Sequence, residues 1–210
     1  MKLLHIDSSI RAEASASRQV SAAIVEAYAG ATPGLEIIRR DLDTDPIPHL
    51  DSRRLPTVRP ANAPEGATGI PDPEGDAALA EFLAADIVVI GAPMYNFGVP
   101  SQLKAWLDRI LIAGKTFRYT ESGPIGLAGG TKIVVASSRG GLYSPGMPYE
   151  PFDFQERYLR AVFAFIGIPE IEIVRAEGLA LGPEQRDGAL AAARAAIPAV
   201  VSGNGARHAA

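Results

Sequence analysis

The stretch from Ile87 to Leu111 reads IVVIGAPMYNFGVPSQLKAWLDRIL, and it decides the fold. It opens with a β-branched run at 87–90 that is apolar on both faces, as expected for a strand in the centre of a buried parallel sheet. From Ser101 onward, apolar residues recur at spacings of three and four, which predicts an amphipathic helix. The loop between them, 92–100, is too apolar and aromatic for a simple connection. Because ligands of open α/β sheets bind at the carboxyl ends of strands, we expect this loop to form the floor of a site for a flat aromatic ligand.

The same alternation of buried strand and helix continues along the chain. Strands are predicted at 2–7, 35–40, 132–137 and 171–176, and helices at 18–29, 75–85, 151–166 and 183–196. Residues 115–119 are expected to form a short extended piece, and residues 123–130 to form turns. The pattern predicts an α/β fold, a doubly wound five-stranded parallel sheet with helices on both faces. We expect a single domain over residues 1–202 and a flexible tail over residues 203–210.

The composition narrows the class of protein. The 210 residues are 47% hydrophobic and 21% charged, which is ordinary for a globular domain. A net charge of −4 gives no indication of a nucleic-acid or anionic-membrane partner. The lack of cysteine excludes disulfides and thiol chemistry, and the three histidines have no ligand spacing, so no metal site is predicted. Neither a signal peptide nor an apolar run of about 20 residues is found, so we expect a cytoplasmic location.

Two features of the sequence indicate contacts that the domain does not make within its own core. The segment 41–74 is irregular and contains seven prolines, and loops of this length inside a domain are usually functional or partner-facing. The predicted helix at 151–166 carries more aromatic residues than one apolar stripe would place on one face, namely Phe152, Phe154, Tyr158, Phe163 and Phe165. We expect these aromatics to make a second contact.

The loop after the first strand is rich in hydroxyl groups. It runs from Ser8 to Ser17 and opens a helix, where free backbone N–H groups and the helix dipole favour an anion. The loop has neither the glycines of a GxGxxG motif nor the GKS of a nucleotide-triphosphate loop. It therefore favours a terminal phosphate monoester held by Ser9, Ser15 and Ser17. The alternative is simple helix capping by Ser15 or Ser17.

Two further loops offer a surface for a ring system. The Met94–Phe97 loop combines apolar surface with the amide of Asn96, although it could instead be a hydrophobic plug over the core. The Ser138–Gly141 loop allows close backbone approach because glycine has no Cβ, although it could instead be a flexible turn. Together with the phosphate loop, they describe a flat ligand of mononucleotide size. FMN fits better than any nucleotide triphosphate.

Five motifs carry a resemblance that covers nearly the whole chain: APMYNF at 92–97, TFRYTESGPIGL at 116–127, SSRGG at 137–141, FIGI at 165–168 and AEGLALGPE at 176–184. They resemble the FMN-dependent NAD(P)H azoreductase and quinone reductase family, which is flavodoxin-like in fold. The resemblance implies that FMN is bound by Ser9, Ser15, Ala16, Ser17, Met94, Tyr95, Asn96, Phe97, Ser138, Arg139, Gly140 and Gly141. One departure is Ala16, where relatives often have a polar residue such as glutamine, although its backbone N–H remains. The resemblance also implies a homodimer with FMN near the interface.

The function implied by the resemblance is a two-electron transfer. In the expected ping-pong cycle, NADH or NADPH gives a hydride to N5 of FMN, the product leaves, and a quinone, azo or nitroaromatic acceptor takes both electrons. Backbone donors of the 94–97 or 138–141 loop would stabilise negative charge near N1, and no side chain need act as an acid. Tyr119 is a candidate wall of the site or a cover of the dimer seam. Arg139 could face the dinucleotide, but we expect it to be solvated.

Other functions stay open at this point. A flavodoxin-type electron carrier would use the same fold and cofactor, but such carriers are usually shorter and more acidic, and the 41–74 segment argues against one. A serine hydrolase is suggested by Asp7-Ser8-Ser9 and would need a histidine base. His5 lies within the first strand as a core or near-core residue, His49 in the irregular segment and His208 in the tail, so none is well placed. A binding module on the same fold is a further alternative.

Overall fold

A five-stranded parallel sheet forms the centre of the protein in the computed structural model, which describes residues 1–55 and 69–203. The strand order is β2-β1-β3-β6-β7, and every neighbouring pair is parallel. The strands are β1 (Lys2–Asp7), β2 (Glu36–Asp41), β3 (Ile87–Pro93), β6 (Lys132–Ser138) and β7 (Glu172–Ala176). This order is the flavodoxin-like form of the doubly wound sheet. The predicted fold class is confirmed.

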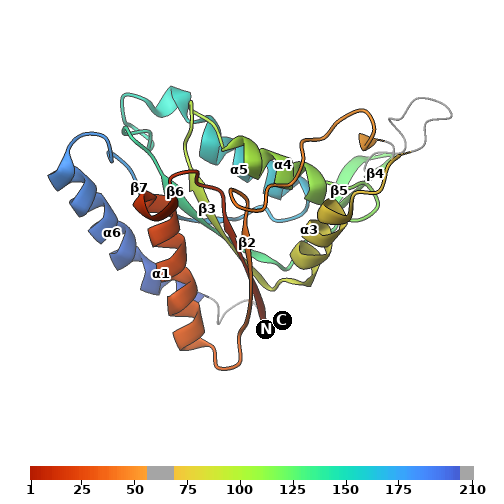
Figure 1. Cartoon of the computed structure of the whole chain (residues 1–210), viewed down its shortest axis with the longest axis horizontal. Coiled ribbons are helices and arrows are strands. Elements are labelled where there is room, and N and C mark those ends of the chain that lie inside the picture. Colours follow the sequence, from red (N-terminus) through yellow and green to blue (C-terminus); the bar gives the residue numbers. More distant parts are fainter. Residues whose placement is uncertain (56–68, 204–210) are drawn as a thin grey trace.

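Helices cover both faces of the sheet (Figure 1). On one face lie α1 (Ala16–Ala31) and α6 (Pro183–Ser202), and on the other α3 (Pro73–Ala84), α4 (Ser101–Ile110) and α5 (Phe154–Phe165). The core is accordingly divided into two apolar clusters of buried residues, one of which includes Phe82 and Trp106, and the other Ile24 and Tyr28. Each layer is built by helices that bury one apolar stripe against the strands.

The central strand and the helix after it behave as the sequence pattern requires. All seven residues of β3 are buried, because the strand has a neighbour on each side and a helical layer on each face. In α4, Leu103, Trp106, Leu107 and Ile110 are fully buried, and the Trp106 ring meets Phe82 of α3 edge to face at 5.9 Å. Burying each such side chain contributes about 1.5–3 kcal/mol to folding. The strand runs to Pro93, beyond the β-branched run at 87–90.

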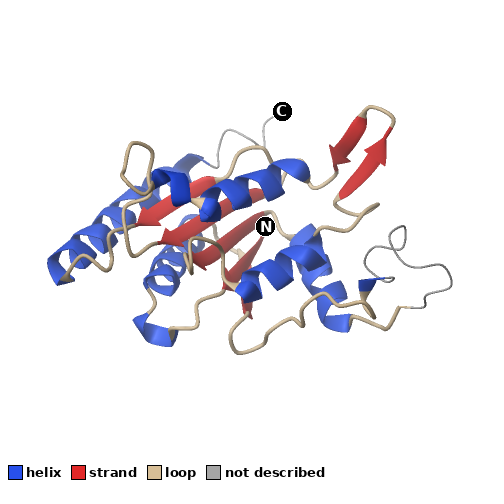
Figure 2. Cartoon of the chain, turned by 90° about the horizontal axis from the view of Figure 1, so that it is seen from above, coloured by secondary structure: helices blue, strands red, loops and turns tan. Residues whose placement is uncertain are grey.

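The predicted turn at 123–130 is wrong in its first part, because Gly123–Gly126 forms strand β5. It pairs antiparallel with β4 (Phe117–Thr120), and this hairpin projects beyond the main sheet (Figure 2). Gly126 lies directly against the backbone of Ile166 and Gly167, where no Cβ would fit. This contact seats the hairpin at the end of α5. The sequence of this strand, GPIG, has no pattern that predicts a strand. Its place is given instead by the tertiary contact of Gly126.

Several helix boundaries also differ from the prediction, including that of α3, which begins at Pro73 instead of residue 75. Helix α5 begins at Phe154 after a short 3-10 turn, because the Asp153 side chain accepts a bond of 2.9 Å from the Glu156 N–H and so caps the helix. Helix α1 begins at Ala16 instead of residue 18, and α6 continues through Pro198 to Ser202.

The described part of the irregular segment packs on the domain. Leu42 and Ile47 are buried in the core, and Arg109 donates a hydrogen bond of 2.7 Å to the Pro48 carbonyl. Residues 56–68 of this segment, and all but the first residue of the predicted tail, lie outside the described residues. Within the described ranges, no helix has the length and apolar character needed to cross a bilayer.

Candidate cofactor site

The three loops singled out from the sequence meet at the carboxyl edge of the sheet. They follow β1, β3 and β6, which are neighbouring strands. The Met94 N–H donates to the Ser138 carbonyl at 2.8 Å, which joins the second loop to the third. The Tyr95 hydroxyl lies 3.1 Å from Ser9 Oγ and accepts a bond of 3.3 Å from the Ile10 N–H, which joins the second loop to the first.

A pocket of about 110 Å³ lies between these loops. Eight of the twelve predicted cofactor residues line it: Ser9, Ser15, Ala16, Met94, Tyr95, Ser138, Arg139 and Gly140. The other four, Ser17, Asn96, Phe97 and Gly141, lie outside its lining. A wider apolar groove of about 820 Å³ adjoins it through the shared residue Tyr95, and Asn96 lines this groove together with Val99, Phe154 and Tyr158.

The hydroxyl loop combines helix capping with a place in the pocket. Ser15 is the N-cap of α1, and its Oγ accepts a bond of 3.3 Å from the Arg18 N–H. The alternative of capping is therefore confirmed for Ser15, but the same residue lines the pocket beside Ala16. Ser17 is fully buried, with its Oγ 3.1 Å from Ser15 Oγ. The N–H groups of Ala16 and Ser17, at the start of α1, have no partner within the helix, so they remain available to an anion.

The aromatic loop is a tight two-residue turn. Tyr95 and Gly98 exchange two backbone hydrogen bonds of 3.0 Å, and Asn96 and Phe97 between them have φ angles of 47° and 71°. Positive φ at both central residues is what a type I′ hairpin turn requires. Phe97 is 46% exposed and its ring lies 5.5 Å from that of Phe152. The alternative of a plug over the core with Asn96 in a turn is therefore confirmed for the turn but wrong for Phe97, whose side chain at the tip faces outward.

The prediction that Arg139 is solvated is wrong. Its side chain is fully buried, because the start of α5 and the end of β7 surround it with carboxylates. The guanidinium pairs with Asp153 at 3.1 Å and with Glu156, and it lies 3.5 Å from Glu177. The alternative of a flexible turn also fails for this loop, because the Arg139 and Gly140 carbonyls accept bonds from the Leu179 and Ala180 N–H groups.

Two arginines in the pocket lining were missed from the sequence, along with Pro93, Leu179 and Ala180. Arg11 follows β1, and Arg186 comes from α6 and donates a bond of 3.2 Å to the Ala14 carbonyl. Arg11 adds positive charge within the hydroxyl loop, and Arg186 adds it beside that loop. The only signal for Arg186 is its position two residues after the motif at 176–184.

Tyr119 is placed on β4, outside both pockets, with its side chain 73% exposed. Its assignment as a wall of the site or as a cover of the dimer seam stays a prediction. In the wide groove, burial and the nearby Asp108 raise the pKa of Tyr158 to about 12, so its hydroxyl stays protonated at neutral pH.

The serine hydrolase alternative finds no support in the geometry. The Ser8 hydroxyl donates to the Gly91 carbonyl at 2.7 Å, and Ser9 Oγ lies against Tyr95. His5 is buried, as expected, with its ring between Asp7 and Arg39. No described serine of the first loop therefore has a histidine base beside it.

The donor set fits FMN. Hydroxyls, first-turn N–H groups and two arginines gather at one end, as a phosphate monoester requires. The strand-end backbone of the 94–97 and 138–140 loops and the apolar groove gather at the other end, as a ring system requires. A sheet of flavodoxin-like order with such a crevice defines an α/β protein that binds a flat, phosphorylated cofactor.

Comparison with known proteins gives the family. Residues 1–201 match the family described as having a flavodoxin-like fold, and the chain belongs to it. The chain is 52% identical to the FMN-dependent NADH:quinone oxidoreductase of Stenotrophomonas maltophilia, over 94% of this chain and 95% of that one. It is 56% identical to FMN-dependent NADH:quinone oxidoreductase 2 of Bradyrhizobium diazoefficiens, over 92% and 95%.

Solved structures agree with these relatives. The azoreductase AzrA superposes with a TM-score of 0.86 at 29% identity, covering 97% of this chain and 100% of that chain. An FMN-dependent NADH-azoreductase from Bacillus anthracis, solved in complex with FMN, superposes with a TM-score of 0.82 at 28% identity, covering 96% and 100%. The resemblance inferred from the sequence motifs is confirmed.

Proposed function

We propose that this protein is an FMN-dependent oxidoreductase that transfers two electrons from NADH to quinones and azo compounds. The observation that carries the proposal is the pocket in which the loops after β1, β3 and β6 meet. It is supported by relatives named FMN-dependent NADH:quinone oxidoreductases and by structures of azoreductases.

The proposed cofactor contacts divide into two sets. Ser9, Ser15 and the first-turn N–H groups of residues 16–17 bind the phosphate, and Arg11 and Arg186 offset its charge. The loops 94–97 and 138–141 hold the ring system, with backbone donors toward its polar edge. Bound FMN supplies the two-electron redox chemistry, and the chain's residues bind and orient it. A ping-pong order follows if the electron donor and the acceptor use the same groove in turn.

We propose in addition that the protein is a homodimer. Large apolar side chains remain exposed near the groove, including Phe97, Phe152 and Phe154, which are 46%, 47% and 57% exposed. A monomer rarely leaves such a group of aromatics open to water. This exposure agrees with the second contact expected from the helix at 151–166, and a second copy of the chain would cover it. The cytoplasmic location also stays a prediction.

The proposal is tested by the visible spectrum of the purified protein after FMN addition and desalting, followed by anaerobic NADH and then a quinone. We expect flavin absorbance that is retained, bleaches with NADH and returns with the quinone. Retained flavin that neither NADH nor NADPH bleaches would indicate an electron carrier instead. If no flavin is retained, the assignment of the pocket is wrong.

A further inference from the structure

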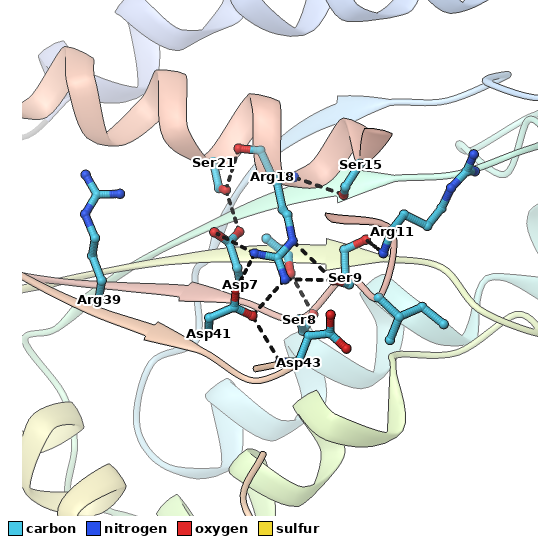
Figure 3. Close-up of polar contacts among 12 residues, drawn as sticks. Asp7, Ser8, Ser9, Arg11, Ser15, Arg18, Ser21, Arg39, Asp41 and Asp43 are labelled. Carbon is cyan, nitrogen blue, oxygen red and sulfur yellow. Dashed lines mark hydrogen bonds and ion pairs between the residues drawn. The ribbon is translucent and has the colours of Figure 1, made fainter. Parts of the chain in front are cut away.

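Arg18, in the first turn of α1, stands at the centre of a polar cluster beside the candidate cofactor site (Figure 3). Its Nε and Nη2 both donate to the Ser9 carbonyl oxygen, at 3.1 and 2.8 Å. Arg18 itself is absent from the lining of the cofactor pocket and lines a separate cavity of about 480 Å³ beside β2. Arg18 therefore binds the loop from Ser8 to Ser17, called the phosphate loop below, on the side away from the cofactor pocket.

The other side of the guanidinium is fixed to the end of β2. Arg18 Nη1 and Nη2 donate to the two carboxylate oxygens of Asp41 at 2.6 and 2.7 Å, a bidentate pair. The Asp43 N–H donates to the same carboxylate at 3.0 Å. The bonds that Arg18 donates to Asp41 lower the pKa of Asp41 and raise the pKa of Arg18, so both groups are charged at neutral pH.

The charge of Arg18 is already balanced by the carboxylates around it. Asp41 binds it directly, and a carboxylate oxygen of Asp7 lies 3.8 Å from Nη1. An arginine paired in this way contributes little net field at the phosphate end of the pocket, in contrast to Arg11 and Arg186, which line it. Any effect of Arg18 on a ligand must therefore come from the conformation that it gives to the loop through the Ser9 carbonyl.

That geometry concerns the peptide between Ser9 and Ile10. In a trans peptide the carbonyl and the N–H point in opposite directions. Because Arg18 holds the Ser9 carbonyl on the β2 side, the Ile10 N–H is directed to the other side, where it donates to the Tyr95 hydroxyl at 3.3 Å. Ser9 Oγ lies 3.1 Å from that same hydroxyl. Arg18 thus determines on which side of the loop the Ile10 N–H lies, and Ser9, which lines the cofactor pocket, has its Oγ against the same Tyr95 hydroxyl.

We infer that Arg18 and Asp41 form a positioning pair that preorganises the loop from Ser8 to Ser17 for the phosphate of the cofactor. The inference rests on the proposed function, which places the phosphate at Ser9 and Ser15. A loop held in its bound shape before binding loses less conformational entropy when the ligand arrives. The pair should therefore strengthen the binding of FMN, and leave the binding of riboflavin, which lacks the phosphate, unchanged.

The test is a fluorescence titration of the full-length apoprotein with FMN and with riboflavin. For Arg18→Ala we expect the Kd for FMN to rise about tenfold and that for riboflavin to change less than about twofold. Arg18→Lys should lie between, since an ammonium group pairs with Asp41 but lacks the planar fork that also holds Ser9. Asp41→Asn serves as a second, nearly isosteric variant if Arg18→Ala folds poorly, which its thermal unfolding without ligand reveals.

Arg40→Ala is the matched control. Arg40 lies on β2 next to Asp41 and forms a bidentate pair with Glu81, both bonds 2.8 Å, without touching the phosphate loop. We expect it to leave the ratio of the FMN and riboflavin affinities unchanged. The inference is overturned if Arg18→Ala and Asp41→Asn weaken both ligands equally, or neither, while the wild type prefers FMN. A wild type without preference for FMN would overturn the phosphate assignment as well.

Discussion

Two arginines hold the loops on opposite sides of the candidate cofactor pocket, and they differ in how far water reaches them. The Arg18 side chain is 18% exposed and binds one carboxylate and one carbonyl, whereas that of Arg139 is 0% exposed among three carboxylates. Ion pairs that water reaches contribute about 0–1 kcal/mol. Removing one partner of a buried pair costs about 3–5 kcal/mol. From this comparison we expect Arg139 to contribute mainly to the stability of the fold, and Arg18 mainly to the conformation of the loop from Ser8 to Ser17.

The largest expected effect is that of Arg139→Ala. It leaves Asp153 and Glu156 buried without their shared cation, so we expect the free energy of unfolding to fall by about 3–5 kcal/mol. Urea unfolding followed by circular dichroism measures this. Arg157→Ala, an exposed arginine on the same helix α5 as Glu156, is the control and should change stability by less than about 0.5 kcal/mol. Equal effects of the two variants would contradict the comparison.

Glu156→Gln should have a smaller effect at the same cluster. The amide keeps the shape but loses the charge that pairs with Arg139 and, at 2.8 Å, with Arg175. Asp153 and Glu177 remain beside Arg139, so we expect a loss of about 1–3 kcal/mol, measured by the same unfolding experiment. A loss as large as that of Arg139→Ala would mean that Glu156 alone balances the buried charge.

Arg18→Ala should lower the stability of the apoprotein by only about 1 kcal/mol, because water can replace its contacts to Asp41 and Ser9. Thermal unfolding without ligand measures this small change. Together with the expected loss of FMN affinity, it would separate an effect on binding from an effect on folding. If Arg18→Ala lowers the stability as much as Arg139→Ala does, the expected difference between the two arginines in their contribution to folding is wrong.

The smallest expected effect is a pH dependence at Asp41. Its pKa is lowered in the folded protein through the bond from Arg18, so its contribution is present above the unfolded pKa of about 3.9 and is lost as the pH falls through the folded pKa. The stability difference between the wild type and Asp41→Asn should therefore be constant from neutral pH to about pH 5, and shrink below about pH 4. A stability difference that grows as the pH falls would contradict the lowered pKa of Asp41 in the folded protein.

Local sequence signals are sufficient for most of the fold. Each strand of the main sheet carries its own β-branched or alternating apolar pattern, and the parallel sheet then brings the loops after β1, β3 and β6 to one edge. Strand β5 lacked such a signal, because its place depends on the contact of Gly126 with the backbone of Gly167.

The parts of the site that escaped prediction depend on contacts between distant segments. Arg139 lies in a glycine-rich loop, which locally indicates exposure, but its carboxylate partners come from Asp153, Glu156 and Glu177, far along the chain. Arg186 likewise reaches the loop from Ser8 to Ser17 only because α6 packs beside α1. The hydrophobic pattern around Arg139 or around Arg186 therefore could not predict these contacts.

The turn at Asn96 and Phe97 has an evolutionary consequence. Left-handed backbone costs a residue other than glycine roughly 1–2 kcal/mol, and Phe97 adopts it at φ 71°, where glycine would be relaxed. Glycine there would remove that strain together with the ring that contacts Phe152. A relaxed turn and the ring contact with Phe152 thus make opposite demands on position 97. A sequence that keeps phenylalanine there retains the ring at the expense of backbone strain.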